Sequence, residues 1–310
     1  MSWSSTKKAS CWRSSGRPVG TLVADQDTGV DAADSQPKQS RAGRNLPAAI
    51  AVGALLGGTL VYTLLFAPRF WVLILAVATP IATHEITRRL REVGYDVPFI
   101  PLALGGQAML WLSLPFGARG VLGAFGATVV IAMMWRLVGQ GLHNAPVNYL
   151  RDVSATILIA VWVPLCMSFA ALLVFRDDGP GRVLCLLFPV VFSDIGGYAV
   201  GVLFGKHPMA PAISPKKSWE GLAGSLVLGV AAAVFAVTVF LDRPWWVGLP
   251  LGLLLVITGV FGDLIESQVK RDLGIKDMGR LLPGHGGIMD RLDALLPSAV
   301  VTWIVLTVLP

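Results

Sequence analysis

The sequence predicts an all-α, polytopic integral membrane protein with about nine transmembrane helices. Hydrophobic residues make up 54% of the 310 residues, charged residues make up only 14%, and the mean hydropathy is +0.67. A water-soluble core cannot accommodate so much apolar surface. The apolar residues also gather in runs close to the length of about 20 residues that crosses the hydrocarbon layer as a helix. These observations argue against a soluble enzyme or binding domain.

Residues 1–44 differ from the rest of the chain. They are rich in Ser, Asp, Lys, Arg and Gly and contain no apolar run comparable to that of a signal peptide. Such a composition cannot bury enough surface to fold alone, so we expect a disordered, basic cytoplasmic tail. We divide the apolar chain that follows into N-terminal transmembrane helices, residues 45–180, and a C-terminal transmembrane catalytic region, residues 181–310.

The apolar runs give the positions of the helices. We expect them at residues 47–66, 70–88, 99–116, 119–138, 153–175, 183–204, 220–241, 246–265 and 294–309. With the N-terminus in the cytoplasm, roughly twenty of the 25 basic residues then fall on the cytoplasmic side. This bias and anionic lipid headgroups explain the net charge of +6, so no nucleic acid partner is expected. Residues 205–219 and 266–293 share the cytoplasmic face, where nucleotides are found.

The charge between the last two predicted helices is unusually concentrated. Asp263, Ser267 and Lys270 recur at i, i+4 and i+7, so they share one face of a helix that leaves the eighth span. A carboxylate near the end of a span needs a nearby cation. An ion pair of Asp263 with Lys270 or Arg271, which merely ends the span, explains this aspartate equally well.

Two further aspartates lie just ahead of the last span. Asp290 and Asp293 are three residues apart and, with Asp263, would form a cluster of carboxylates. Two carboxylates about 4 Å apart repel by about 4 kcal/mol at an effective dielectric constant of 20, so such a cluster calls for a divalent cation. Mg²⁺ usually takes one or two carboxylates together with substrate phosphates. The simpler alternatives are that Asp293 caps the last helix and that Asp290 pairs with Arg291.

A glycine-rich turn, residues 283–287, places three glycines around His285. Glycines let the backbone approach a phosphate and direct its N–H groups toward it, so Gly286 and Gly287 are candidates for anion binding. Four cations lie near the turn in the sequence: Lys270, Arg271, Lys276 and Arg291. An ordinary loop turn also explains the glycine run. His285 either donates to a phosphate, acts as an acid or base, or makes a structural hydrogen bond.

The other cytoplasmic loop carries Lys216, Lys217 and Ser218 directly ahead of a span. These residues could grip phosphates. They could equally mark the cytoplasmic boundary of the membrane, with Trp219 as an interfacial anchor.

Three other polar residues lie in predicted spans. Asp194 is in the sixth, and an ionisable group inside a membrane segment is a functional residue by default. His84 and Glu85, at the end of the second span, are interpreted as structural or interfacial residues.

Several of these motifs together resemble a known family. Residues 267–271, 276–277 and 283–293 closely resemble the signature of phosphatidate cytidylyltransferases, also called CDP-diacylglycerol synthases. Residues 194–198, 205–206 and 214–221 resemble further motifs of the family. Ser218 stands where Thr is common, and Ala294 where Ser is common. The resemblance covers about residues 190–295.

The resemblance implies an enzyme that transfers a cytidylyl group from CTP to phosphatidic acid, giving CDP-diacylglycerol and pyrophosphate, with Mg²⁺ required. It also implies an integral protein of the cytoplasmic membrane that acts in phospholipid biosynthesis at the lipid bilayer, and a homodimer. We predict Mg²⁺-assisted in-line attack of the lipid phosphate on the α-phosphorus of CTP, with no covalent enzyme intermediate. Positioning and charge neutralisation then dominate over base catalysis.

The expected roles follow from this reaction. The expected catalytic residues are Asp263, Ser267, Lys270, His285 and Asp290. The expected metal ligands are Asp263, Asp290, Asp293 and Asp194. The expected substrate-binding residues are Lys216, Lys217, Ser218, Arg271, Lys276, Gly286, Gly287 and Arg291.

The alternative function is a membrane transporter or channel with a cytoplasmic anion-binding loop. Nine spans and Asp194 would suit it. The charged residues nevertheless concentrate in cytoplasmic loops rather than at the bilayer midplane, which favours an enzyme. A CDP-alcohol phosphotransferase is a second rival, but the sequence lacks the Asp-Gly-x-x-Ala-Arg run of those enzymes.

Overall fold

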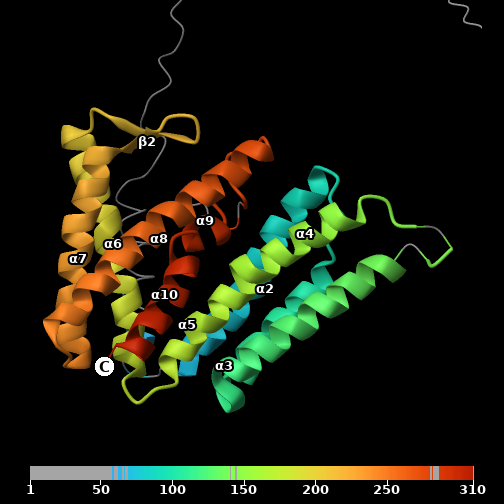
Figure 1. Cartoon of the computed structure of the whole chain (residues 1–310), viewed down its shortest axis with the longest axis horizontal. Helices are drawn as coiled ribbons and strands as arrows, with labels where there is room; N and C mark the ends of the chain where they lie inside the picture. The colour runs from blue at the N-terminus through green and yellow to red at the C-terminus, as the bar shows by residue number, and fades with distance from the viewer. Residues whose placement is uncertain are drawn as a thin grey trace, which may run out of the picture. The chain divides into compact units, whose positions relative to one another are not determined.

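The computed structural model of this chain describes residues 58, 62–64, 66, 69–139, 141–143, 145–279, 281 and 286–309. The predicted tail, most of the predicted first span, and His285 lie outside the described residues. The described chain is helical apart from one small sheet (Figure 1). Its elements are α2 (Arg69–Glu92), α3 (Phe99–Val138), α4 (Tyr149–Ala160), η1 (Val161–Leu165), α5 (Cys166–Val174), α6 (Gly179–Phe204), β1 (Pro208–Ala210), β2 (Ser214–Ser218), α7 (Trp219–Leu241), α8 (Trp245–Asp272), α9 (Met289–Leu292) and α10 (Leu295–Val308).

Seven helical segments of the described chain are long and apolar enough to cross a membrane. They coincide with the predicted spans from the second to the ninth, with the third and fourth joined in α3. The prediction of an all-α integral membrane protein is therefore confirmed. The eighth predicted span, residues 246–265, is extended, because α8 continues to Asp272 and carries Ser267 and Lys270 on its last turns.

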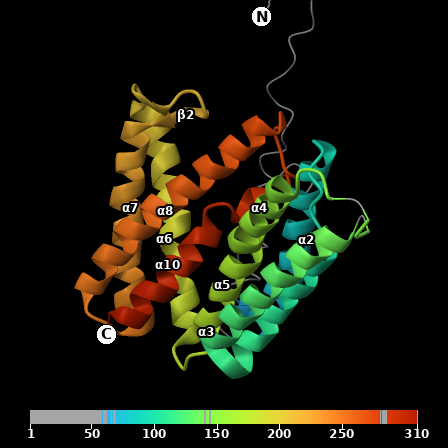
Figure 2. The same ribbon diagram turned by 45° about the vertical axis from the view of Figure 1, so that its right-hand side comes forward.

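α3 is a helical hairpin. A straight helix of 40 residues would be about 60 Å long, about twice the thickness of the hydrocarbon core. The chain reverses at Gly117, whose φ of 58° and ψ of −143° lie in a region that favours glycine. Thr128 of the second half packs directly against Gly105 of the first. Figures 1 and 2 show the two halves of α3 side by side.

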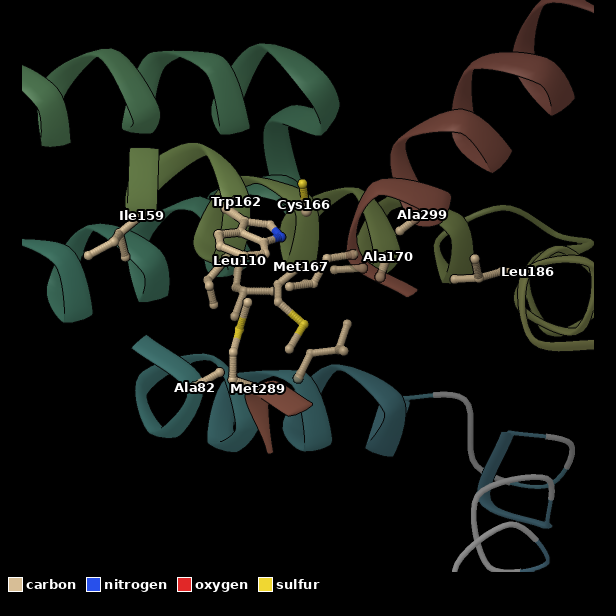
Figure 3. Packing of buried hydrophobic residues seen from close by; sticks show 14 of the residues in the cluster. Ala82, Leu110, Ile159, Trp162, Cys166, Met167, Ala170, Leu186, Met289 and Ala299 are labelled. Atoms are coloured by element: carbon tan, nitrogen blue, oxygen red, sulfur yellow. The ribbon is translucent and has the colours of Figure 1, made fainter. Parts of the chain in front are cut away.

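α4, η1 and α5 form one continuous apolar span, Tyr149–Val174. Pro164, which has no backbone N–H, lies in its π-helical turn η1. Two buried side chains of this span, Trp162 and Met167, pack in the largest hydrophobic core, where Ala82 of α2 and Met289 of α9 meet them (Figure 3). This core therefore joins the first half of the chain to the segment that carries the family signature.

α6 and α7 pack closely because small residues face each other. A methyl group added at Gly196 would overlap the backbone of Gly224, and one added at Gly224 would overlap that of Gly196. Ser225 of α7 also donates a hydrogen bond to the carbonyl of Ser193, at 2.8 Å. This contact fixes the position of Asp194, the next residue on α6, relative to α7.

A two-stranded antiparallel sheet connects α6 to α7. β2 has the sequence Ser-Pro-Lys-Lys-Ser and pairs with β1 from Ser214 to Ser218. The all-α prediction missed this hairpin, because a short strand that contains proline and two lysines has no alternation of apolar and polar residues.

Two arginines hold the end of the last helix. Arg182 Nη1 donates to the carbonyl of Leu306 at 3.1 Å, and Arg243 Nη1 donates to that of Leu309 at 2.9 Å. Asp178 lies between them, 2.6 Å from Arg182 Nε and 3.7 Å from Arg243 Nη2. The guanidinium groups thereby satisfy carbonyls that the final turn of a helix leaves without partners.

Candidate active site

α6, the β1–β2 hairpin, α7, α8 and residues from 276–279 and 286–294 surround a cavity of 1260 Å³. The two loops that the sequence predicts to share one face therefore converge. Most of the predicted site residues lie in the cavity wall: Asp194, Lys216, Lys217, Ser218, Asp263, Lys270, Lys276, Gly286, Asp290, Arg291 and Asp293. Three other predicted site residues in the described chain, Ser267, Arg271 and Gly287, do not line it.

Asp263 of α8 joins the two loops. Its Oδ2 lies 2.5 Å from Lys217 Nζ at the end of the hairpin, so the predicted pairing with Lys270 or Arg271 is wrong. Lys270 points instead to the following loop, with its Nζ 2.6 Å from Asp290 Oδ1. Ser267 Oγ, one turn after Asp263, donates to Asp263 Oδ1 at 3.4 Å and so acts behind the cavity wall. The face of α8 that carries Asp263 and Lys270 therefore contacts two other segments, the β1–β2 hairpin through Asp263 and the loop before α9 through Lys270.

Asp290 organises the backbone around the glycine-rich turn. Both of its carboxylate oxygens lie 3.1 Å from the backbone nitrogen of Met278, and Gly287 N donates to Oδ2 at 2.7 Å. Lys270 is a cationic partner of Asp290, whereas the simpler sequence alternative assigned Arg291 to it. Asp290 therefore shapes the loop, whereas its role as a metal ligand stays a prediction.

Glu266 is a buried carboxyl group whose partner Lys270 lines the cavity, and the half-buried Asp293 lines the same cavity. Glu266 is 1% exposed, with Oε2 3.1 Å from Lys270 Nζ, whereas Oε1 has no hydrogen-bond donor in the described chain. The Asp293 carboxyl group is near enough to repel a charge on Glu266, and the Lys270 ammonium group offsets part of that repulsion. The alternative that Asp293 is the N-cap of the last helix is not what the structure shows, because the N-cap of α10 is Ala294, whose own backbone N–H donates to Asp293 Oδ1 at 2.8 Å.

Residues of the β1–β2 hairpin both stabilise the local structure and line the cavity. Ser218 Oγ accepts a hydrogen bond from Gly221 N at 3.1 Å and so caps α7. Arg271 Nε donates to the carbonyl of Ile213 at 3.2 Å, which ties the turn of the hairpin to the end of α8. Lys216 and Lys217 are thereby presented to the cavity on a braced strand.

Comparison with known proteins identifies the family. Residues 47–309 match the model of the cytidylyltransferase family. The chain belongs to the cytidylyltransferase family. It is 58% identical over 328 aligned residues to a phosphatidate cytidylyltransferase of Mycobacterium tuberculosis strain H37Rv, which covers 100% of both chains. A phosphatidate cytidylyltransferase of Mycobacterium leprae is 58% identical (94% of this chain, 98% of the relative), and one of Staphylococcus saprophyticus is 33% identical (65% and 76%).

Sequence reasoning missed one residue of this site. Glu85 of α2, interpreted as structural or interfacial, is 8% exposed and accepts a hydrogen bond from Met289 N at 2.9 Å. Its carboxylate also lies against Gly279 and Gly287. The signal that could have identified it was a carboxylate near the end of an apolar span, which rarely stays there without a function. Glu85 brings α2 to the loop that borders the cavity.

The acidic groups of this member of the cytidylyltransferase family fit a divalent cation. No three Asp, Glu, His or Cys side chains of the described residues converge into a metal site that is complete by itself. Mg²⁺ needs no such cage, since it usually keeps waters and takes one or two carboxylates with substrate phosphates. Asp194, Asp263 and Asp293 line one cavity and can supply such carboxylates.

Proposed function

We propose that this chain transfers the cytidylyl group of CTP to phosphatidic acid, forming CDP-diacylglycerol and releasing pyrophosphate, as an enzyme of phospholipid biosynthesis. Similarity over the whole chain to proteins named phosphatidate cytidylyltransferase carries this proposal. The cavity suits it chemically, because cations and carboxylates from separate segments surround one space. Such a wall can hold a triphosphate, a lipid phosphate and a divalent cation together.

The reaction is an in-line displacement. An oxygen of the lipid phosphate attacks the α-phosphorus of CTP, and the bond from that phosphorus to the oxygen bridging to the β-phosphorus breaks, so pyrophosphate leaves. The attacking oxygen is already anionic, so the enzyme needs no strong base and forms no covalent intermediate. Its work is to align the two phosphates and to neutralise their charge.

The side chains around the cavity divide this work. The proposed substrate-binding residues are Lys216, Lys217, Ser218, Arg271, Lys276, Gly286, Gly287 and Arg291. The proposed catalytic residues are Asp263, Ser267, Lys270, His285 and Asp290. The cations would hold phosphates on opposite walls, which brings the nucleotide and the lipid headgroup together while the acyl chains remain in the bilayer.

Mg²⁺ is the proposed cofactor. Asp263 and Asp293 are the first candidates to hold it, with Asp194 on the neighbouring helix and Asp290 in the loop. When bound, Mg²⁺ would neutralise phosphate oxygens and so lower the repulsion between the two anionic substrates. The contacts of Asp290 with four protein groups leave it less free for this role than Asp263.

We propose nine membrane spans, a cytoplasmic N-terminus and an active site that faces the cytoplasm of a cell membrane. Because α3 reverses at Gly117 it counts as two spans, so the seven helical segments of the described chain make eight spans. The predicted first span would bring the total to nine. Arg89 contacts the loop at Met278, and Arg271 contacts the β1–β2 hairpin, so these basic segments gather at one end of the helices. That end would be cytoplasmic.

In the proposed division of the chain, residues 181–310 carry out the reaction, and the membrane helices of residues 45–180 support them structurally. Every described residue that lines the cavity lies between Asp194 and Ala294, which supports this division. A homodimer is part of the proposal by family resemblance.

The decisive experiment measures pyrophosphate released from CTP when phosphatidic acid is added to the purified protein in lipid–detergent micelles. We expect release that depends on both substrates and on Mg²⁺, and that EDTA abolishes. The Asp263→Asn variant should lose about 10²-fold or more in kcat, since one well-placed electrostatic group contributes that much. Asp272→Asn is the matched control, because Asp272 lies on the same helix and its side chain contacts Gln268 rather than the cavity.

If the wild-type protein releases no pyrophosphate under these conditions, the proposed activity is contradicted and the transporter alternative is favoured. Unchanged turnover in Asp263→Asn would instead remove only this residue from the catalytic set.

A further inference from the structure

Glu85 clasps two ends of the loop between α8 and α9. Its Oε2 accepts a hydrogen bond from Met289 N, the residue directly before Asp290. A methyl group added at Gly279 or at Gly287 would overlap the Glu85 carboxylate. These two glycines are therefore required by close approach to an acid that comes from a distant helix, and not only by the shape of the turn.

The same loop ends are held from the other side by Asp290. Met278 N and Gly287 N both donate to its carboxylate. The two loop ends also touch each other, since a methyl group added at Gly287 would come 2.7 Å from Gly279 N. The carboxylates of Glu85 and Asp290 thus both bind backbone N–H groups at the place where the two loop ends meet.

Arg89, one turn after Glu85, fixes the first of these loop ends. Its Nε donates to the carbonyl of Met278 at 2.9 Å, and its Nη2 donates to that of Asp277 at 3.3 Å. The side chains of Met278 and Met289 are both buried in the largest hydrophobic core. Figure 3 shows Met289 close to Ala82, one turn before Glu85 on α2.

We propose that Glu85, with Arg89, is a positioning residue for cytidylyl transfer. Its side chain does not line the cavity. It holds residues 277–279 and 286–289 so that Lys276, Gly286 and Asp290 keep their places in the cavity wall. The proposal rests on the proposed function of that cavity. A displacement of about 1 Å in a group that aligns reacting phosphates can lower the rate about 10²-fold.

Three substitutions at Glu85 test the proposal. Glu85→Ala removes the acceptor, Glu85→Asp keeps the charge but withdraws it by one methylene, and Glu85→Gln keeps an oxygen that can reach Met289 N. We expect kcat/KM to fall about 10²-fold in the first two variants. The kcat/KM of the Gln variant should stay within about tenfold of wild type, because the amide oxygen still accepts the hydrogen bond from Met289 N, although without a negative charge.

A second readout separates positioning from stability. Hydrogen exchange followed by mass spectrometry should show faster exchange in Glu85→Ala for peptides covering residues 277–290, with unchanged exchange in α6 and α7. The melting temperature of Glu85→Gln should match that of wild type. Arg89→Ala should show the same local change, whereas Arg88→Ala serves as control, because the exposed Arg88 side chain pairs only with Glu92 in the described contacts.

The proposal is overturned if Glu85→Ala keeps kcat/KM within twofold of wild type. It is equally overturned if all three variants lose activity in proportion to a lowered melting temperature, because that pattern belongs to a general structural residue. A wild-type protein without activity toward phosphatidic acid would contradict the proposed function instead, and the local exchange result would still report on the clasp.

Discussion

Single carboxylates of this protein have sharply different surroundings although they lie close together. Asp263 and Asp290 each have a lysine within 2.6 Å. Glu266 shares its lysine, is almost fully buried, and has one oxygen without a donor in the described chain. A buried charge that is only partly paired lowers stability. We therefore expect Glu266 to lower the free energy of unfolding relative to a neutral side chain of the same shape.

This gives a prediction for Glu266→Gln. In EDTA the variant should be more stable than wild type by about 1–3 kcal/mol, because the neutral amide is not repelled by Asp293 and Lys270 keeps its ion pair with Asp290. For a chain of this size that raises the melting temperature by roughly 2–6 °C. Turnover with Mg²⁺ should fall at least tenfold. Differential scanning calorimetry and the pyrophosphate assay measure the two effects, and a variant that is both less stable and fully active would contradict the prediction.

At the residue scale, the sequence identified groups whose spacing carries information. Asp263 and Lys270 share a helix face, and Asp194 is an acid in a span, so their places in the cavity could be predicted. Their partners could not. The pairing of Asp263 with Lys217 depends on how two loops separated by a whole helical hairpin meet, and Glu85 depends on how α2 packs against α9. Both are properties of tertiary packing, which no local pattern records.

At the scale of elements, hydropathy located the membrane helices because each must be about 20 apolar residues long. It located the joint between the two halves of α3 only as a gap at residues 117–118. The structure gives the reason for that gap, since Gly117 has a backbone conformation that other residues adopt only with strain. The β1–β2 hairpin was beyond prediction, because it forms where the chain leaves the membrane and hydropathy no longer applies. The extension of α8 past residue 265 lay beyond hydropathy too, but the spacing of Asp263, Ser267 and Lys270 predicted it.

The helical hairpin gives a second prediction. Gly117→Ala should destabilise the protein by about 1–3 kcal/mol, because alanine pays a steric penalty at this φ and ψ. Gly126→Ala, in the second half of the same hairpin, should be neutral or slightly stabilising, because a methyl group there meets nothing within 4 Å. Thermal unfolding in detergent distinguishes the two, and equal melting temperatures would show that the reversal at Gly117 tolerates a side chain.

At the scale of the whole molecule, the charged segments gather at one end of the helical bundle, and the connection between α5 and α6 lies at the other. α6 runs from one end to the other over 26 residues, which separates them by about 39 Å. The proposed orientation therefore assigns opposite sides of the membrane to Asp177, before α6, and to Ala212, in the hairpin after it.

This assignment can be measured with single cysteines. In a Cys11→Ser background, with Cys166 and Cys185 buried, Asp177→Cys should react with a membrane-impermeant maleimide in intact cells. Ala212→Cys should react only after the membrane is opened or inverted. Both positions are exposed, so accessibility within the protein does not limit labelling. The reverse pattern would place the cavity on the outer side and contradict the cytoplasmic active site.

The arginine contacts at the end of α10 hold a helix whose other end borders the site. Arg182 and Arg243 bind carbonyls within four residues of the final Pro310, so the last turn of the chain is held against the start of α6 and the connection before α8. The opposite end of α10 follows Asp293 in the cavity wall. One end of α10 is therefore anchored by two arginines while the other end borders the site, so a change that loosens the arginine contacts is expected to reach the cavity through a single short helix.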